Sequence, residues 1–150
     1  MSGHGHSHDE AMPSVDELIA RLRAAGGRVT TARRAVLEAI VDAGSAHLTA
    51  EEVAASVHRS TPEVHLSTVY RTLESLEQLG LLRQARLGAG PVSYHLAVDE
   101  HHHAVCTVCG RVIHLSAATL APVTRRLAKD HDFLADPHHL TITGRCAGCL

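Results

Sequence analysis

The sequence predicts an α+β protein made of two unlike parts, and three observations lead to this class. Apolar residues recur at helical spacing in four segments of the first 80 residues. A glycine-rich turn then separates two short strand-like segments within 81–96. Beyond residue 97 the pattern changes to short strands around one amphipathic helix. We therefore expect a His-rich tail over 1–13, a mainly helical domain over 14–96 and a small α/β domain over 97–150.

Capping signals set the bounds of the predicted helices. Ser14 with Glu17 and Thr49 with Glu52 each have the spacing of a capping box, in which both side chains satisfy backbone N–H groups. Ser67 is the expected N-cap of the fourth helix. Glycines end three of the four helices. The helices are expected over 14–25, 30–44, 49–58 and 67–79.

Helices followed by a two-stranded hairpin are typical of a winged helix-turn-helix, in which the helix 67–79 would enter the major groove of DNA. Its outward face carries hydrogen-bonding side chains that suit base edges and phosphates. Five arginines also lie between residues 21 and 34 with no acid among them. A solvated face is the simpler interpretation of the arginine run, and a plain surface helix explains the outward residues as well as DNA reading does. The outward residues are Ser67, Thr68, Tyr70, Arg71 and Ser75.

The second part is expected to contain strands over 104–107, 111–115 and 139–144, and a helix over 116–130. All four cysteines of the chain lie here as two Cys-x-x-Cys pairs. Four thiolates suit a closed tetrahedral Zn²⁺ site that stabilises the fold, with backbone amides pointing at the sulfurs. A redox-active dithiol or disulfides would use the same residues. The proposed structural zinc ligands are Cys106, Cys109, Cys146 and Cys149.

The chain contains 14 histidines, and those at positions 95 and 101–103 lie close to the boundary between the two parts. In an extended segment His101 and His103 share one face, while Glu100 and His102 share the other. His101 and His103 can surround one cation together with three further histidines, which are His47 and His95 from the first part and His114 from the second. Such a site would couple the orientation of the two parts to metal occupancy. His residues of the tail, at positions 4, 6 and 8, are a further loose metal-binding segment or simply a flexible tail.

Composition bounds the function. The formal charge is −2, so nucleic-acid binding has to come from local clusters. No signal peptide or membrane span is recognisable, which favours the cytoplasm and makes metal binding the usual role of paired cysteines. A metallohydrolase would need a general base beside an open metal position. No such arrangement is apparent, and we expect neither an enzyme nor a small organic substrate.

Three segments carry a resemblance to the Fur family of metal-responsive transcription regulators. They are STVYRTLESLEQLGLL (67–82), HHHAVC with the following CG (101–110) and CAGC (146–149). The resemblance extends from about Val15 to Leu150. It implies a winged-helix domain hinged to an α/β dimerisation domain, and a metal-loaded homodimer that binds a palindromic operator in double-stranded DNA, usually as a repressor.

The resemblance also implies roles for individual residues. The four cysteines match the family's structural zinc site. His47, His101 and His103 match its sensor-site histidines. His95 and His114 fall where relatives place acids. Tyr70 and Arg71 match DNA-contacting residues of the recognition helix, and Arg28 matches a basic residue that approaches the minor groove.

Two departures from the family pattern bear on the metal. The sensor candidates are all imidazoles, whereas iron and manganese sensors favour carboxylate oxygens, so the donor set moves the preference toward Zn²⁺, Ni²⁺ or Co²⁺. Zn²⁺ is the favoured sensed ion, with Ni²⁺ or Fe²⁺ as the next candidates. The extra wing histidines of the nickel-responsive branch are replaced by Gln84 and Arg86. A candidate secondary site would use Glu100, His102 and His138, but its usual helix acid is Ala121.

These observations predict a metal-dependent DNA-binding repressor that controls metal homeostasis genes. A peroxide-sensing regulator of the same fold, in which bound iron oxidises a histidine ligand, is one alternative. A His-rich metal-buffering protein is another.

Overall fold

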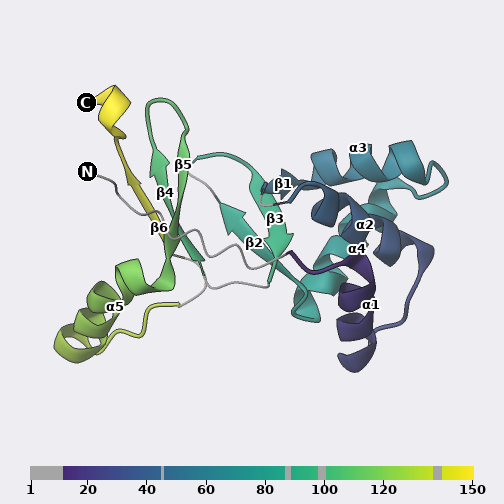
Figure 1. Cartoon of the computed structure of the whole chain (residues 1–150), viewed down its shortest axis with the longest axis horizontal. Helices are drawn as coiled ribbons and strands as arrows, with labels where there is room; N and C mark the ends of the chain where they lie inside the picture. Colours follow the sequence, from purple (N-terminus) through teal and green to yellow (C-terminus); the bar gives the residue numbers. More distant parts are fainter. Residues whose placement is uncertain (1–11, 45, 87–88, 98–100, 137–139) are drawn as a thin grey trace, which may run out of the picture.

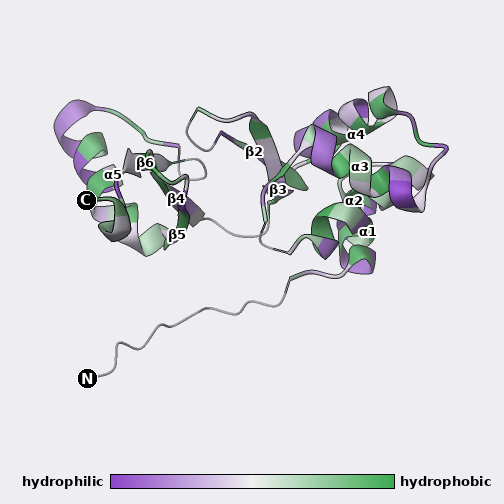
Figure 2. Cartoon of the chain, turned by 90° about the horizontal axis from the view of Figure 1, so that it is seen from above, coloured by the Kyte–Doolittle hydropathy of each residue, from purple (hydrophilic) through white to green (hydrophobic). Residues whose placement is uncertain are grey.

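The structure is a computed structural model that describes residues 12–44, 46–86, 89–97, 101–136 and 140–150. Its elements form two parts that lie end to end (Figure 1). Figure 2 shows β2 and β3 between the four helices of the first part and the sheet of the second. The predicted α+β class is confirmed. The predicted tail 1–13 falls almost entirely outside the described residues, and so does Gly88, the first residue of the expected turn.

The helices of the first part are α1 (Val15–Ala24), α2 (Thr31–Asp42), α3 (Ala50–Ser60) and α4 (Leu66–Gln78). Both predicted capping boxes are present. The Ser14 N–H donates to the Glu17 carboxylate at 2.7 Å, and the Thr49 N–H donates to the Glu52 carboxylate at 2.7 Å. Each cap satisfies N–H groups that the first turn of a helix leaves without partners. The helix starts predicted from sequence are therefore correct for α1, α2 and α3.

The predicted start of α4 is wrong by two residues. The N-cap is His65, with extended backbone and no side-chain cap, and the helix begins at Leu66. Ser67 lies in the first turn instead. The backbone N–H groups of Thr68 and Val69 both donate to the His65 carbonyl, at 3.0 and 3.1 Å. Burial of Val69, Leu73 and Leu76 stabilises this helix, so packing rather than a side-chain cap sets where it starts.

The wing consists of β2 (Leu82–Arg86) and β3 (Val92–Leu96), as predicted. A third strand, β1 (Leu48–Thr49), was not expected because two residues carry no periodicity. It pairs with β3 in the register Leu48↔Tyr94 and Thr49↔Ser93, giving the order β1-β3-β2. The same antiparallel register sets His47 opposite His95. This short strand therefore brings together two histidines that are 48 positions apart in the sequence.

The main hydrophobic core belongs to the first part. Its buried members come from α1–α4, β2 and β3, and include Leu22, Leu37, Ile40, Leu73 and Leu76. Among the described residues after Ala97, the buried apolar side chains are those of Val105, Cys106 and Leu120. The second part thus has little apolar core of its own.

The second part contains β4 (His101–Cys106), β5 (Val112–Ser116), α5 (Ala117–His131), β6 (Thr141–Gly144) and the short 3-10 helix η1 (Ala147–Cys149). Its sheet has the order β5-β4-β6, with β4 and β5 antiparallel and β4 and β6 parallel. The first strand begins three residues earlier than predicted, because pairing with β5 extends to His101↔Ser116. No described helix is long and apolar enough to span a membrane.

Candidate metal centres and nucleic-acid interface

The four cysteines converge between the β4–β5 turn and the end of the chain. Their sulfur atoms all lie within 4.8 Å of one another. The Sγ atoms of Cys109 and Cys146 are 3.7 Å apart. Each of the four is a free cysteine in the structure, which contains no disulfide among them. β6 delivers the second pair to the first by running parallel to β4, with Cys106 beside Gly144.

Hydrogen bonds change the pKa values of two cysteines in this cluster. The Cys146 N–H donates to the Cys106 Sγ at 3.4 Å, as the sequence had led us to expect. N–H groups of Cys109, Cys146 and Val108 favour the thiolate and lower the pKa of Cys106 to about 6. Hydrogen bonds with the sulfurs of Cys146 and Cys109 instead raise the pKa of Cys149 to about 12. The backbone around Cys106 therefore favours the thiolate form that a metal ligand requires.

The cysteine cluster fits zinc. A tetrahedral site with Zn–S bonds of about 2.3 Å has sulfur atoms roughly 3.8 Å apart. The measured 3.7 Å between Cys109 and Cys146 agrees with this spacing. Four thiolate ligands leave no open coordination position, so such an ion stabilises the fold and supplies no catalytic water.

Four imidazole rings form a second cluster where the two parts meet. The ring centroid of His47 lies 4.6 Å from that of His95, 4.6 Å from that of His103 and 5.8 Å from that of His114. The centroid of His103 lies 5.2 Å from that of His114 and 6.2 Å from that of His95. The cluster thus combines two rings from the first part with two from the second.

Each ring is brought there by strand pairing. His47 precedes β1 and His95 lies on β3, whereas His103 and His114 are direct partners across β4 and β5. His95 and His103 are 7% and 4% exposed. The Nε2 atoms of His47 and His103 are buried as well. Neutral imidazole nitrogens at such spacing are a donor set suited to Zn²⁺, Ni²⁺ or Co²⁺.

Several predicted ligands are not placed by the structure. Glu100 and His138 lie outside the described residues, and for His101 only the backbone is described. His102 is 3% exposed and pairs with Leu115, which puts it on the sheet face opposite His103. On the wing, the Gln84 amide donates to the carboxylate of Glu77 on α4 at 2.6 Å, a contact within the first part.

The predicted DNA-reading residues lie along α4. Ser67, Tyr70 and Arg71 are exposed, and Thr68 is half-buried. The Tyr70 hydroxyl donates to the Glu51 carboxylate of α3 at 2.8 Å. The pKa of Glu51 is lowered first by a hydrogen bond with the backbone and then by the bond with Tyr70. The same bond with Glu51 raises the pKa of Tyr70. Sequence reasoning missed Glu51 because the contact spans 19 positions between two helices.

Arg28 lies exposed in the loop between α1 and α2, close to the start of α2. Its carbonyl accepts a hydrogen bond from Arg33 at 2.8 Å, and Arg33 also donates to the Ser75 hydroxyl at 2.6 Å. Ser75, which the helical pattern had placed on the outward face with Tyr70 and Arg71, therefore faces the α1–α2 loop. The role of Arg33 has no sequence signal beyond its membership in a run of basic residues.

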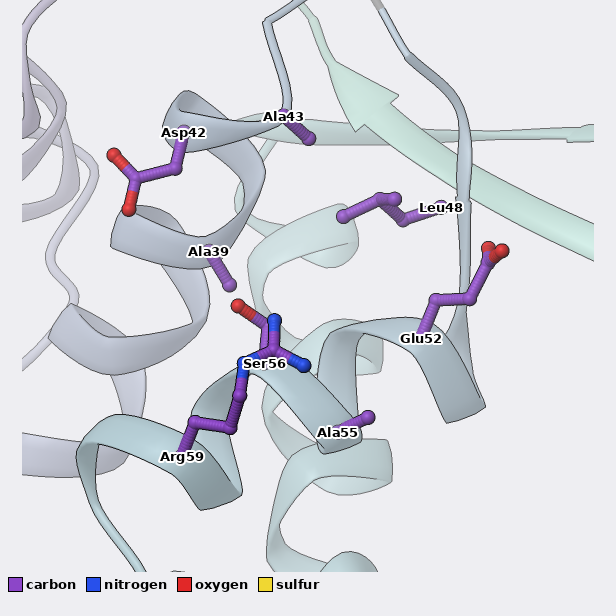
Figure 3. Close-up of a pocket in the computed structure, with 8 residues that line it drawn as sticks. All are labelled: Ala39, Asp42, Ala43, Leu48, Glu52, Ala55, Ser56 and Arg59. Carbon is purple, nitrogen blue, oxygen red and sulfur yellow. The ribbon is translucent and has the colours of Figure 1, made fainter.

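A groove lies between α2 and α3 (Figure 3), and its lining includes no cysteine or histidine. The carboxylates of Asp42 and Glu52 stand on opposite sides of it and point away from each other. Glu52 is engaged with the Thr49 N–H. We assign no ligand to this groove, whose lining residues are Ala39, Asp42, Ala43, Leu48, Glu52, Ala55, Ser56 and Arg59.

A winged helix joined to a small sheet that gathers thiols and imidazoles defines a metal-binding regulator of transcription. Comparison with known proteins gives the family. The model of the ferric uptake regulator family matches residues 24–143. The ferric uptake regulation protein of Bacillus subtilis is 33% identical over 139 residues, covering 90% of this chain and 93% of that protein. This chain belongs to the ferric uptake regulator family.

Two further similarities agree with this assignment. The peroxide-responsive repressor PerR of Staphylococcus aureus is 27% identical over 135 residues, covering 90% of each chain. The solved structure of the Helicobacter pylori ferric uptake regulator has a TM-score of 0.76 at 21% identity, over 93% of this chain and 96% of that one. The family consists of DNA-binding transcription regulators that act as dimers, and the protein is not an enzyme.

Proposed function

We propose that this chain is a repressor whose operator affinity is controlled by a divalent metal held between its two parts. The observation that carries the proposal is the cluster of His47, His95, His103 and His114, with two rings from each part. A cation bound by all four fixes the angle between the winged helix and the second sheet. That angle in turn sets the separation of the two recognition helices in a dimer.

Zinc is the proposed sensed ion, with nickel or iron as the next candidates. The four clustered side chains are all imidazoles, and carboxylates are the ligands that suit manganese and iron sensors better. The cysteine cluster is proposed to hold a second, structural Zn²⁺. His101 remains a proposed sensor ligand, and Glu100, His102 and His138 remain a candidate secondary site.

An exposed apolar row supports the proposed homodimer. Ala104 of β4 pairs with Ile113 of β5 on one side and with Ile142 of β6 on the other. Ile113 is 40% exposed and Ile142 is 47% exposed. Strand alternation puts this row on the face opposite His103 and His114. A second copy of the chain covering this face would bury the row without covering the imidazole cluster on the opposite face.

The remaining parts of the proposal follow from this arrangement. The domain boundary is proposed at 96/97, after the end of β3 at Leu96. The DNA contacts are assigned to Arg28, Ser67, Thr68, Tyr70 and Arg71. The partner is a palindromic operator in the cytoplasm, near genes of metal homeostasis.

Titration of the dimer against a palindromic DNA library with Zn²⁺, Ni²⁺, Fe²⁺ and Mn²⁺ tests the function. We expect Zn²⁺ to raise operator affinity in the wild type, and His95→Ala to lose that increase while keeping the cysteine-bound zinc. His131→Ala, on the exposed end of α5, is the matched control and should behave as the wild type. Equal operator affinity with and without every metal refutes the proposal.

The second candidate function is peroxide sensing, which the similarity to PerR favours. It predicts that the Fe²⁺-loaded protein gains an oxygen atom on a cluster histidine when peroxide is added. Mass spectrometry of the peptides that contain His47, His95 and His103 distinguishes this from a sensor of the metal itself.

A further inference from the structure

We propose that Arg33 is a positioning residue that holds the loop carrying Arg28 against the recognition helix α4. Arg33 would thereby set the distance between the minor-groove arginine and the side chains that read the major groove. This inference rests on the proposed function, because it uses the DNA contacts assigned to Arg28, Tyr70 and Arg71.

The geometry of one guanidinium carries the proposal. The Arg33 Nη1 donates to the Arg28 carbonyl at 2.8 Å, and its Nη2 donates to the Ser75 Oγ at 2.6 Å. The first bond reaches the α1–α2 loop, and the second reaches α4 across 42 positions of sequence. Because the guanidinium is planar and rigid, these two bonds fix the loop relative to the helix in direction as well as distance.

The same loop is fixed at its other end by close packing. The Gly27 N–H donates to the Leu22 carbonyl at 2.9 Å. A Cβ at Gly27 would stand 2.3 Å from a methyl carbon of Leu22 and 3.0 Å from one of Leu79. The backbone at Gly27 therefore lies directly between the end of α1 and the end of α4. Arg28 follows immediately, so Gly27 and Arg33 hold it from both sides.

A direct phosphate contact is the competing role for Arg33, since the residue belongs to a basic run. Arg33 is half-buried, whereas Arg28 is exposed. Both terminal nitrogens of Arg33 already donate to protein atoms. Its neighbour Arg34 lies 3.6 Å from the Asp16 carboxylate and 3.9 Å from that of Glu38. These contacts favour a structural role for Arg33, whereas the exposed Arg28 is the residue assigned to contact DNA.

Salt dependence separates the two roles. A phosphate contact contributes about 0.9 to the slope of log affinity against log salt, so a variant that keeps every charge but misplaces Arg28 still lowers the slope, whereas a direct phosphate contact by Arg33 would survive the change to lysine. Operator affinity of the metal-loaded dimer is therefore measured over a series of KCl concentrations for the wild type, Arg33→Lys and Ser75→Ala. Arg33→Lys keeps the charge but cannot form both bonds in one plane.

We expect both variants to bind the operator roughly tenfold more weakly, the equivalent of one hydrogen bond to a charged group, with the salt slope lowered as in Arg28→Ala. In an Arg28→Ala background, Arg33→Lys should cause no further loss. Hydroxyl-radical footprinting should show that protection of the minor groove is lost while the major-groove contact is kept. Thermal unfolding checks that each variant is folded, and Ser75→Ala provides the test if a change at Arg33 prevents folding.

Three results would overturn the inference. They are full affinity in Ser75→Ala, full affinity in Arg33→Lys, and equal losses from Arg33→Lys with and without Arg28. Failure of the wild type to bind any operator with metal is a different result, which refutes the proposed function itself. A wild type that responds to metal, combined with any of the three results above, refutes only the role of Arg33.

Discussion

Removing metal from the four cysteines is expected to unfold the second part of the chain while the first part stays folded. The reason lies in the distribution of buried side chains. After Ala97, the described residues bury two ordinary apolar side chains, those of Val105 and Leu120, in addition to Cys106. Burying two such side chains contributes about 3–6 kcal/mol, whereas a structural zinc contributes on the order of 10–16 kcal/mol in small zinc domains. A zinc ion held by the four cysteines would therefore be the larger stabilising contribution there.

Hydrogen–deuterium exchange with and without a strong chelator measures this effect segment by segment. We expect the amides of β4, β5 and β6 to lose protection on chelation, whereas the amides of α2 and α4 keep it because eighteen buried residues of the main core hold them. Cys146→Ser should reproduce the effect of the chelator. Sustained protection of β4 in the metal-free protein, or equal loss in both parts, would show that the cysteine cluster does not stabilise the second part.

Further predictions concern stability, the recognition helix and the dimer. Gly27→Ala should destabilise the first part by about 1–3 kcal/mol through overpacking against Leu22. Gly144→Ala, whose Cβ meets nothing within 4 Å, should change little; denaturant unfolding compares the two. Glu51→Gln should lower the pKa of Tyr70 toward its ordinary value, because the carboxylate that disfavours the phenolate is gone. Phenolate absorbance during a pH titration follows this change, and an unaltered titration contradicts it. Ile142→Glu should weaken the dimer in sedimentation experiments, since it sets a charge in the proposed interface.

Much of the local structure was predictable from the sequence, because local rules decide it. The capping boxes at Ser14 and Thr49 fixed where α1 and α3 begin, and both are present. The start of α4 was mispredicted because a plausible N-cap, Ser67, lies two residues inside a helix that packing extends to Leu66. The strand β1 was missed because two residues have no pattern, and its existence depends on pairing with β3.

The two candidate metal sites also differ in how far the sequence could predict them. Two Cys-x-x-Cys pairs indicate a tetrahedral thiolate site from spacing alone, and the structure sets their sulfurs within 4.8 Å. The histidines were a set of candidates without a known geometry. Their meeting at one place depends on the β1–β3 and β4–β5 registers, which join segments far apart in the chain.

The amino-acid sequence by itself determined the class of the fold, the chemistry of the candidate metal ligands and the helix proposed to carry the DNA-reading side chains. These depend on residue type and on periods of a few positions, which a linear chain displays directly. Tertiary structure alone decided that His47 and His95 meet His103 and His114, that Tyr70 binds Glu51, and that Arg33 joins the Arg28 loop to α4. Each of these contacts depends on strand register or helix packing, which place residues together whatever their separation along the chain.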